Sequence, residues 1–331
     1  MSKYKALVTE EISENTYKRS IQELDTINLP DNDVLIKVQY SSLNFKDALS
    51  ARGHKGITRK YPHTPGIDAA GVVTESKSID FQEGDQVIVT GYDLGMNTAG
   101  GFGQYISVPA SWVVKLPDGL SLRESMMYGT AGFTSAICIN EIISKKIKPG
   151  NSEILVTGAT GGVGITAVGM LNKIGYNVIA STGKTDFESL LMEIGATKVI
   201  NRSEVHDKSQ RPLLSARWDA VVDTVGGNTL STVIRSTKMH GLVCILGNVE
   251  SDILNVSVYP FLLRGVNIAG IDSASKDMEL RNYLWKMIAS EWKIENLENY
   301  IKEVKLENLS GEIDVILRGG QFGRILVNLI D

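Results

Sequence analysis

The clearest chemistry in the sequence lies in residues 154–171, which read ILVTGATGGVGITAVGML. An apolar strand runs into a glycine-rich turn and then into a helix with one apolar side. Gly161 would let the backbone approach a pyrophosphate, Gly164 would let the helix pack on the strand, and free N–H groups of the helix start would hold the anion. Ala159 replaces the first glycine of the usual G-x-G-x-x-G pattern, so a purely structural turn is the alternative. We predict dinucleotide contacts from Ala159, Thr160, Gly161, Gly162, Val163 and Gly164.

The next predicted strand ends in Ser181-Thr182-Gly183-Lys184, and these residues bear on which dinucleotide binds. Enzymes that use NAD usually carry an acidic residue here, which accepts a hydrogen bond from the ribose 2′-hydroxyl. A carboxylate would repel a 2′-phosphate, whereas Ser181, Thr182 and Lys184 would bind one. Asp186, the next acidic residue, is interpreted as the cap of the following helix. We therefore predict NADPH as the cofactor, with a merely solvated Lys184 as the alternative.

The composition is that of an ordinary globular chain, with 331 residues of which 43% are apolar and 22% charged. Lys and Arg total 34 and Asp and Glu total 38, so the net charge of −4 predicts neither a nucleic-acid partner nor an anionic membrane surface. We expect no signal peptide in MSKYKALVTE and no membrane span, because no long apolar stretch is present. The two cysteines lie far apart in apolar segments, which is typical of buried thiols in the cytoplasm.

The elements that must position these residues change character along the chain. Residues 1–122 read as short strands with long loops, and the pattern changes at Ser121, which has capping-box spacing to Glu124. Residues 121–143 look helical in two parts. The strands predicted before this change are Val34–Gln39, Gly71–Thr74, Asp85–Thr90 and Gln104–Val108.

Strands and helices alternate from residue 153 onward, which indicates a doubly wound parallel sheet in an α/β fold. The tail, residues 273–331, is too short for a third domain, and we expect it to return to the amino-terminal domain. The predicted strands are Glu153–Thr157, Asn177–Ser181, Lys198–Ile200, Ala220–Asp223, Leu242–Leu246, Val266–Ile271 and Arg324–Leu329. The predicted helices are Val163–Ile174, Phe187–Ile194, Leu230–Thr237, Met278–Ser290 and Trp292–Val304.

The whole chain resembles the medium-chain dehydrogenase/reductase superfamily and, more closely, its zinc-independent YhdH/YhfP subgroup of quinone oxidoreductases and acrylyl-CoA reductases. The resemblance implies a GroES-like, β-rich catalytic domain in residues 1–122, completed by 273–331, and a Rossmann NADP-binding domain in residues 123–272. The segments that carry it are SLNFKDALSARG (42–53), PGIDAAG (65–71), GGFGQY (100–105), VTGATGGVG (156–164), YPFLLRGVNIAGIDS (259–273) and FGRILVNL (322–329).

The resemblance also bears on a metal site. Zinc alcohol dehydrogenases of this superfamily hold the catalytic metal with a Cys, a His and a second Cys, aided by an acidic residue. At the positions that match the three ligands this chain has Asn44, Ile67 and Thr130, and Asp68 stands where the acidic residue would be. Thiolate and imidazole ligands are therefore absent from these positions, and we predict no metal. The four His show no ligand spacing, and His54 and His63 are expected to be solvated beside a loop.

Without zinc as a Lewis acid, the substrate itself must be electrophilic, as an α,β-unsaturated carbonyl or a quinone is. The protein must then stabilise the oxyanion that hydride transfer creates. Asn44 is predicted as an orienting donor, with a turn or cap role as the alternative. Asp68 is predicted to order Asn44 or to relay a proton, with a turn-stabilising role as the alternative. Tyr40 is a candidate proton donor by residue type, although a packed strand tyrosine is the simpler interpretation.

Other residues are assigned by the resemblance or by their charge. Arg324 resembles a late arginine that contacts the cofactor pyrophosphate, with a surface strand residue as the alternative. The resemblance further implies cofactor contacts from Ile271 and Asp272, and more weakly from Thr134 and Asn248. A basic run is predicted either as a solvated loop or as a site for coenzyme A phosphates. It consists of Arg52, Lys55, Arg59 and Lys60.

These features together predict an NADPH-dependent, zinc-independent reductase of activated C=C bonds, acting on acrylyl-CoA or a similar 2-enoyl thioester. An NADPH:quinone oxidoreductase is the first alternative. An NADPH-binding sensor or structural protein with little turnover is the alternative of another class. We also predict a cytoplasmic homodimer in which Val266–Ile271 is the edge strand that pairs two subunits.

Overall fold

The computed structural model describes residues 2–330, which divide into two compact units. The first unit contains the residues up to Thr130, Ser273–Ala289 and the residues from Glu298 onward. The second unit contains Ala131–Asp272 and Ser290–Leu297. The division at Thr130 falls inside a helix, α2 (Leu122–Ser144), next to a non-helical glycine, whereas the sequence pattern changes at Ser121. The predicted Ser121–Glu124 capping box at the start of this helix is confirmed by reciprocal hydrogen bonds.

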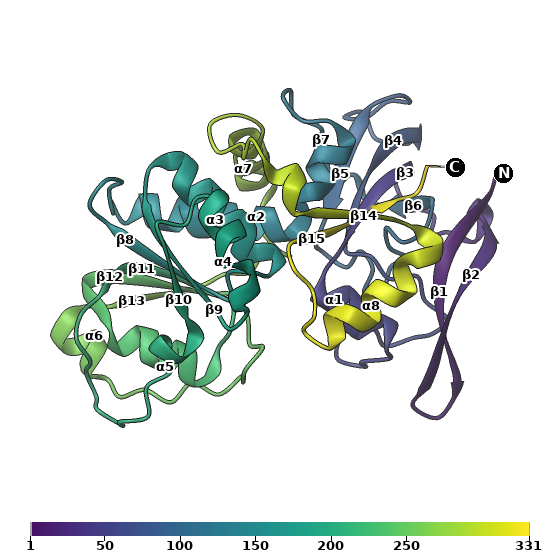
Figure 1. The fold of residues 1–331 in the computed structure, drawn as a ribbon. Helices are drawn as coiled ribbons and strands as arrows, with labels where there is room; N and C mark the ends of the chain where they lie inside the picture. Colours follow the sequence, from purple (N-terminus) through teal and green to yellow (C-terminus); the bar gives the residue numbers. More distant parts are fainter. Residues whose placement is uncertain (1, 331) are drawn as a thin grey trace. The chain divides into compact units, whose positions relative to one another are not determined.

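The first unit is built on a mostly antiparallel sheet, which two strands after residue 300 complete (Figure 1). Its strand order is β14-β15-β3-β4-β5-β7, and β6 pairs with β3. The alternation predicted for Val34, Ile36 and Val38 is confirmed, since all three side chains are buried in β3. The strands are β3 (Val34–Leu43), β4 (Asp68–Ser76), β5 (Gln86–Thr90), β6 (Tyr105–Val108), β7 (Val113–Lys115), β14 (Ile301–Lys305) and β15 (Arg324–Asn328).

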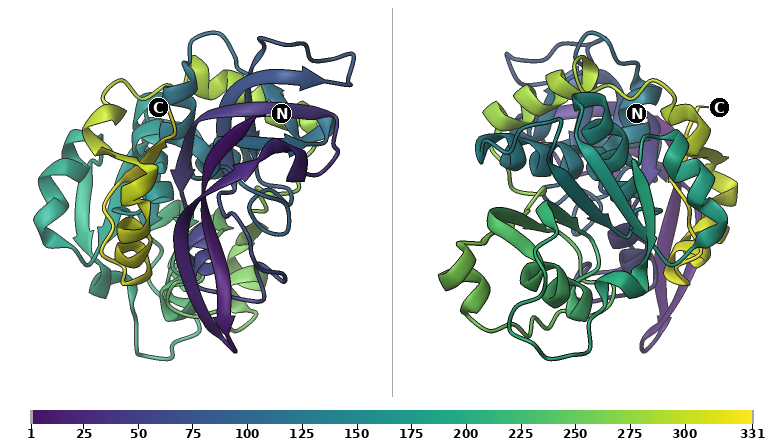
Figure 2. Two further views of the ribbon diagram at one scale, coloured as in Figure 1. Left: turned by 90° about the vertical axis from the view of Figure 1, so that its right-hand side faces the viewer. Right: turned by 60° about the vertical axis from the view of Figure 1, so that its left-hand side comes forward.

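Several elements of this unit were not predicted. A long twisted hairpin of β1 (Lys3–Ser13) and β2 (Thr16–Asp25) forms a two-stranded sheet of its own (Figure 2). Two short helices, α1 (Phe45–Ala51) and α8 (Leu309–Leu317), pack against each other. In contrast, helix α7 (Met278–Ala289) of this unit was predicted, and its bounds are close to the predicted Met278–Ser290.

The helix predicted over Trp292–Val304 is wrong. Leu297–Tyr300 forms a short 3-10 helix, and Ile301–Lys305 forms β14, which pairs in parallel with β15. The segment IKEVK buries Val304 and exposes its charged residues. Its pairing with β15, in which Ile301 lies opposite Arg324, overrides its local helix propensity.

The second unit confirms the doubly wound parallel sheet. All six strands are parallel, in the order β10-β9-β8-β11-β12-β13. The helices α2, α3 and α4 lie on one face of the sheet, and α5 and α6 lie on the other (Figure 1). The strands are β8 (Glu153–Thr157), β9 (Asn177–Thr182), β10 (Lys198–Asn201), β11 (Trp218–Asp223), β12 (Thr237–Ile245) and β13 (Asn267–Gly270). The helices are α3 (Gly162–Ile174), α4 (Glu188–Glu193), α5 (Gly227–Arg235) and α6 (Tyr259–Arg264).

Two further predictions concern the interior. Cys138 and Cys244 are buried and unpaired, as their apolar surroundings in the sequence predict. The predicted helix over Leu230–Thr237 in fact ends at Arg235, and Thr237 already begins β12. Among residues 2–330, no helix is both long enough and apolar enough to cross a membrane.

Candidate functional site

A buried carboxylate organises the polar residues of the first unit. Asp68 is the first residue of β4 and has no exposed surface. Its oxygens accept hydrogen bonds from Ser42 Oγ at 2.5 Å, Asn44 Nδ2 at 2.8 Å and Thr130 Oγ1 at 2.6 Å. The backbone N–H of Thr130 also donates to both oxygens, at 3.0 and 2.9 Å. We call Ser42, Asn44, Asp68, Thr130 and Arg324 the Asp68 cluster.

Asn44 is held in one orientation by partners on both sides of its amide. It stands immediately before α1, where its backbone N–H donates to Asp47 at 2.8 Å. Its side-chain nitrogen donates to Asp68, and its side-chain oxygen accepts from Arg324 at 3.2 Å. Exchanging the amide oxygen and nitrogen would place the oxygen against the Asp68 carboxylate and the NH2 group against the Arg324 guanidinium. The charges of Asp68 and Arg324 therefore fix the orientation of the Asn44 amide.

Arg324 is packed inside the first unit. Its side chain is 2% exposed, so the alternative of a surface strand residue is wrong. It donates to the carbonyl oxygens of Leu43 and Met127 at 3.3 Å each, and to Ser42 Oγ at 2.6 Å. Its guanidinium lies 3.9 Å from the Asp68 carboxylate. Burial lowers the pKa of Arg324, while the neighbouring Asp68 and Asp47 act against that shift.

The cluster leaves no room at Gly129, the non-helical residue inside α2. Its φ of 51° and ψ of −153° suit glycine. A side-chain carbon built there would come within 2.3 Å of Ser42 Oγ and 2.5 Å of Asp68 Oδ2. The close approach of the backbone at this kink allows the Thr130 N–H to reach the carboxylate.

Asp47 is a second buried acid that sequence reasoning missed. It accepts from the backbone N–H groups of Asn44 and Ile67, each at 2.8 Å. Burial, together with the nearby charge of Asp68, raises the pKa of Asp47 from its usual 3.8 to about 7. The acid three residues after Asn44 at a helix start is a signal that could have identified it.

This shift predicts a pH dependence that Asp47→Asn would remove. The folded protein holds the proton more tightly than the unfolded chain does, so this residue adds stability as the pH falls from about 7 towards 4. The slope approaches ~1.4 kcal/mol per pH unit within that window. Urea unfolding at several pH values should show that the advantage of the parent protein over Asp47→Asn grows as the pH falls. An equal pH dependence in both proteins would contradict the assignment.

The donors at the positions that match zinc ligands do not fit zinc. Asn44 and Thr130 offer an amide and a hydroxyl, both already bonded to Asp68, and Ile67 offers an aliphatic side chain. Within residues 2–330, no group of three His, Cys, Asp or Glu side chains could hold a metal ion. The prediction that His63 is solvated is wrong, because it is 8% exposed with its Nε2 2.9 Å from the Gly95 carbonyl oxygen.

The glycine-rich turn of the second unit has the geometry of an anion site. Gly161 stands before α3, a helix of 13 residues whose first N–H groups have no intrahelical partner. A side-chain carbon at Gly164 would lie 2.4 Å from the Gly158 carbonyl oxygen, so only glycine lets the helix start lie this close to the turn. The predicted contacts of this turn thus lie together at the carboxyl end of β8.

The predicted 2′-phosphate residues follow on the neighbouring strand. Ser181 and Thr182 are buried at the end of β9, and Lys184 lies in the turn that follows, where its N–H donates to Thr182 Oγ1 at 3.0 Å. Partial burial lowers the pKa of the Lys184 ammonium. Asp186 does not cap a helix as predicted. It lies inside the 3-10 helix Thr185–Phe187, and α4 begins after Phe187 without a side-chain cap.

Arg202 is a residue that sequence reasoning missed. It begins the 3-10 helix Arg202–Val205, directly after β10. A side-chain carbon built on Gly183 would lie 2.7 Å from Arg202 Nε, so the guanidinium lies directly over Gly183. It therefore stands beside Ser181, Thr182 and Lys184. Only the pairing of β10 with β9 brings it there, and the sequence spacing gives no signal of this.

The remaining predicted contacts lie on separate elements. Thr134 is buried in α2, Asn248 is exposed after β12, and Tyr40 is partly exposed in β3. Ile271 and Asp272 follow β13, and the Ile271 N–H donates to the Ile245 carbonyl at 2.9 Å.

The basic run of the first unit is not uniform. Lys55 donates to Glu11 at 2.6 Å, and its ammonium lies 5.3 and 5.0 Å from the ring centroids of Tyr17 and Tyr61. The β1–β2 hairpin therefore contacts this lysine through Glu11 and Tyr17. Arg52, Arg59 and Lys60 have exposed side chains.

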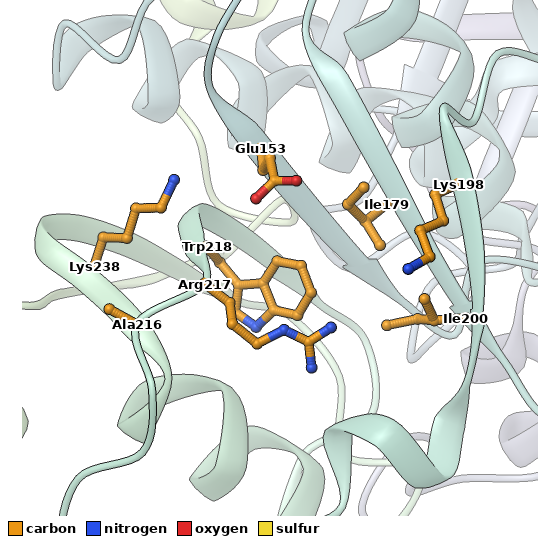
Figure 3. A pocket seen from close by; sticks show the side chains of 8 residues that line it. All are labelled: Glu153, Ile179, Lys198, Ile200, Ala216, Arg217, Trp218 and Lys238. Atoms are coloured by element: carbon orange, nitrogen blue, oxygen red, sulfur yellow. The ribbon is translucent and has the colours of Figure 1, made fainter.

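A pocket of about 230 Å³ lies at the opposite end of the second unit's strands (Figure 3). It is lined by residues that begin strands, among them Glu153, Lys198 and Trp218. Two of its cationic side chains already have carboxylate partners, since Lys238 bonds Asp219 at 2.8 Å and Arg217 lies 3.8 Å from Glu204. Nucleotides bind at the carboxyl ends of parallel strands, so this pocket is not the dinucleotide site.

Comparison with known proteins places this geometry in a family. Residues 30–118 match the alcohol dehydrogenase GroES-like domain, and residues 162–290 match the zinc-binding dehydrogenase domain. The acrylyl-CoA reductase AcuI of Ruegeria pomeroyi is 38% identical over 98% of this chain and 99% of its own. The yhdH oxidoreductase of Salmonella enterica, solved in complex with NADP, has a TM-score of 0.95 and 36% identity, and the match covers 98% of this chain and 100% of that one.

A third relative was solved with a different dinucleotide. YhfP of Bacillus subtilis, which is named as a quinone oxidoreductase, is 42% identical over 93% of this chain and 94% of its own. Its structure with NAD bound has a TM-score of 0.96 and covers 99% of this chain and 100% of that one. The resemblance predicted from the sequence is confirmed. The chain belongs to the medium-chain dehydrogenase/reductase superfamily, in the subgroup that contains YhfP, YhdH and AcuI.

Proposed function

We propose that the protein is an NADPH-dependent, zinc-independent reductase of activated C=C bonds whose substrate is acrylyl-CoA or a similar 2-enoyl thioester. The Asp68 cluster carries the proposal, because it places a polarised amide and hydroxyl where metal-dependent relatives need their two thiolates, while Ile67 stands where they need imidazole. An unactivated alcohol would lack the Lewis acid it requires, whereas an enoyl thioester is already electrophilic. The similarity to AcuI favours a thioester over other activated alkenes.

The chain's residues divide the work between binding and orientation. NADPH, when bound, supplies the hydride that goes to the β-carbon of the alkene, and a proton completes the reduction at the α-carbon. In the second unit, Gly161 to Gly164 would hold the pyrophosphate, and Lys184 and Arg202 would hold the 2′-phosphate. These groups fit NADPH because the turn is open to an anion and its neighbours are basic.

Asn44 and Thr130 are the members of the Asp68 cluster that a ligand can reach, since both are half-buried while Ser42, Asp68 and Arg324 are buried. The buried members fix the direction of the Asn44 amide before a ligand arrives, so little reorganisation is needed when charge develops on the thioester oxygen. We propose Asn44 as the residue that orients substrate or cofactor, and Asp68 and Arg324 as residues that position Asn44.

A quinone substrate is the second candidate. The name of YhfP favours it, and so does the pairing of Lys55 with Glu11, which removes one cation from the surface that would meet coenzyme A phosphates. Arg52, Arg59 and Lys60 are left for that role.

The deciding experiment follows NADPH oxidation by purified protein, first with acrylyl-CoA, then with a small quinone, and with NADH in place of NADPH. Faster turnover with acrylyl-CoA and NADPH would support the proposal. Turnover with the quinone alone would replace it by the second candidate. Tight NADPH binding without turnover of either substrate would make the protein a sensor or structural binder.

We also propose a homodimer formed through β13. This strand is the last in the order of the six-stranded sheet, so one side of its backbone is available to a second copy. Ile268 is 39% exposed in β13, and α6 carries the exposed side chains of Leu262 and Leu263 close by in the chain. An isologous pair of such edges would join two sheets and cover these apolar side chains.

The dimer proposal predicts that Ile268→Lys gives a monomer, because the new ammonium would be buried at the interface without a partner. Sedimentation at micromolar concentration should show the parent protein at twice the monomer mass and the variant at the monomer mass. Ile79→Lys, which alters a fully exposed isoleucine of the first unit, is the matched control. A monomeric parent protein would refute the proposal.

Two further assignments belong with this function. We propose that residues 1–122, completed by 273–331, form the catalytic domain and that residues 123–272 form the NADP-binding domain. The unpaired thiols of Cys138 and Cys244 support a cytoplasmic location, where thiols stay reduced.

A further inference from the structure

The segment after β12 is packed tightly on the turn after β11. The Glu250 N–H donates to the Val225 carbonyl at 2.8 Å, and the Gly227 N–H donates to the Ser251 carbonyl at 3.1 Å. A side-chain carbon at Gly247 would lie 2.2 Å from the Thr224 carbonyl oxygen, which shows how close the two backbones are. We call residues 246–251 the β12 loop.

The side chain of Glu250 fastens the β12 loop to a helix. Its carboxylate accepts from the backbone N–H groups of Asn228 at 3.3 Å and Thr229 at 3.1 Å, in the first turn of α5. His206 Nε2 lies 3.1 Å from the same carboxylate. Burial raises the pKa of Glu250, but the hydrogen bonds from Thr229 and His206 outweigh burial and lower it. A carboxylate at a helix start also interacts favourably with the helix dipole.

His206 is itself held against α5 by the residue that follows it. The Asp207 N–H donates to Thr232 Oγ1 at 2.9 Å, and its carboxylate accepts from Arg235 at 3.0 Å. The Asn228 side chain donates to the Asp207 carbonyl at 3.0 Å. Glu250 therefore meets donors that are themselves held by hydrogen bonds, and this contact adds to the backbone hydrogen bonds that position the β12 loop.

The strand order indicates which half of a dinucleotide this loop would meet. The phosphate turn follows β8, and the proposed 2′-phosphate residues follow β9 on one side of it. The strands β11, β12 and β13 lie on the other side of β8. A dinucleotide with its pyrophosphate at β8 and its 2′-phosphate at β9 must extend its nicotinamide half over the ends of those strands.

We propose that Glu250 is a positioning residue for the nicotinamide half of the cofactor. Through α5 and His206 it fixes the β12 loop, which carries Asn248, at the carboxyl end of β12. The inference rests on the proposed function only in that NADPH is taken to bind the second unit. Replacing the carboxylate by an amide removes its charge and one of the two oxygens that accept from Asn228 and Thr229. The loop would then be held less firmly, mainly by its backbone hydrogen bonds to Val225 and Gly227.

The test compares two ligands on Glu250→Gln in the full-length protein. NADPH spans both halves of the site, whereas adenosine 2′,5′-bisphosphate carries the 2′-phosphate but no nicotinamide. We expect the dissociation constant of NADPH to rise about tenfold, as loss of a charged hydrogen bond does, while that of adenosine 2′,5′-bisphosphate stays the same. Glu250→Asp, which keeps the charge, should recover part of the NADPH affinity.

Glu204→Gln is the matched control, because Glu204 is an exposed carboxylate of the same unit that pairs only weakly with Arg217, at 3.8 Å. It should change neither dissociation constant. Unchanged NADPH binding by Glu250→Gln, or an equal loss for both ligands, would overturn the inference. If Glu250→Gln fails to fold, His206→Gln replaces the imidazole that contacts the Glu250 carboxylate. This variant must then bind NADPH more weakly and adenosine 2′,5′-bisphosphate as tightly as the parent protein does. Failure of the parent protein to bind NADPH would instead refute the proposed function.

Discussion

Arg202→Ala is expected to raise the KM for NADPH by roughly 10- to 100-fold, which corresponds to the ~1.5–3 kcal/mol of a hydrogen bond to a charged group. The guanidinium lies over Gly183, beside Ser181, Thr182 and Lys184, where a ribose 2′-phosphate would be bound. The KM for NADH should stay the same, because NADH has no phosphate there. Steady-state rates with each nucleotide measure the preference for NADPH over NADH. This preference should fall by the same factor by which the KM for NADPH rises.

The control for this prediction is Arg217→Ala, which removes an arginine of the same unit at the opposite end of the strands. It should leave both KM values as they are. An equal loss of NADPH and NADH affinity in Arg202→Ala would show that the residue supports the fold and does not select the cofactor. The NAD bound to YhfP makes this comparison informative, since members of the subgroup differ in the dinucleotide found in their structures.

Asp68→Ala is expected to lower the free energy of unfolding by about 3–5 kcal/mol, the usual cost of leaving one partner of a buried ion pair alone. Arg324, which is only 2% exposed, would keep its positive charge in the interior without a counter-ion. Ser42, Asn44 and Thr130 would lose their common hydrogen-bond acceptor. Since Asn44 would then lack one of the two charges that orient its amide, kcat should fall as well. Urea unfolding and steady-state kinetics on the same preparation measure both effects.

The double variant Asp68→Ala/Arg324→Met tests the electrostatic explanation. Replacing the cation by an apolar side chain of similar length should recover part of the stability lost in Asp68→Ala, but none of the activity. A double variant that is less stable than Asp68→Ala would contradict the argument. Asp31→Ala, which removes an exposed carboxylate paired with Lys77, should leave both stability and kcat unchanged.

The parts of the fold that the sequence could predict are those that depend on local pattern. The strand at residues 153–157, the glycine turn and helix α3 carry their own signals in apolar runs and glycine spacing. The alternation that follows gives the parallel sheet, and the spacing of Ser121 and Glu124 gives a helix start. Each of these signals lies within a few residues of the structure it specifies.

The parts that could not be predicted depend on contacts between distant residues. Arg202 reaches Gly183 only through the pairing of β10 with β9, and Arg324 becomes a buried partner of Asp68 only through the pairing of β15 with β3. Lys55 belongs to a basic run in the sequence, yet it forms an ion pair with Glu11, which lies in a hairpin more than forty residues earlier. Charge and residue type suggest these side chains as candidates, but the sheet register decides which ligand or partner they meet.

The register of β15 has a consequence for the synthesis of the protein. Ile325 to Asn328 pair with Leu43 to Tyr40, and Arg324 enters the Asp68 cluster at the start of this strand. A ribosome must therefore have made the chain as far as residues 324–328 before the first unit can complete its sheet or bring a counter-ion to its buried carboxylate. The strands of the second unit all lie between residues 153 and 270 and can pair earlier. Until residues 324–328 are made, Tyr40 to Leu43 of β3 lack their β15 partner, and premature termination before residue 324 leaves Asp68 without its internal counter-ion.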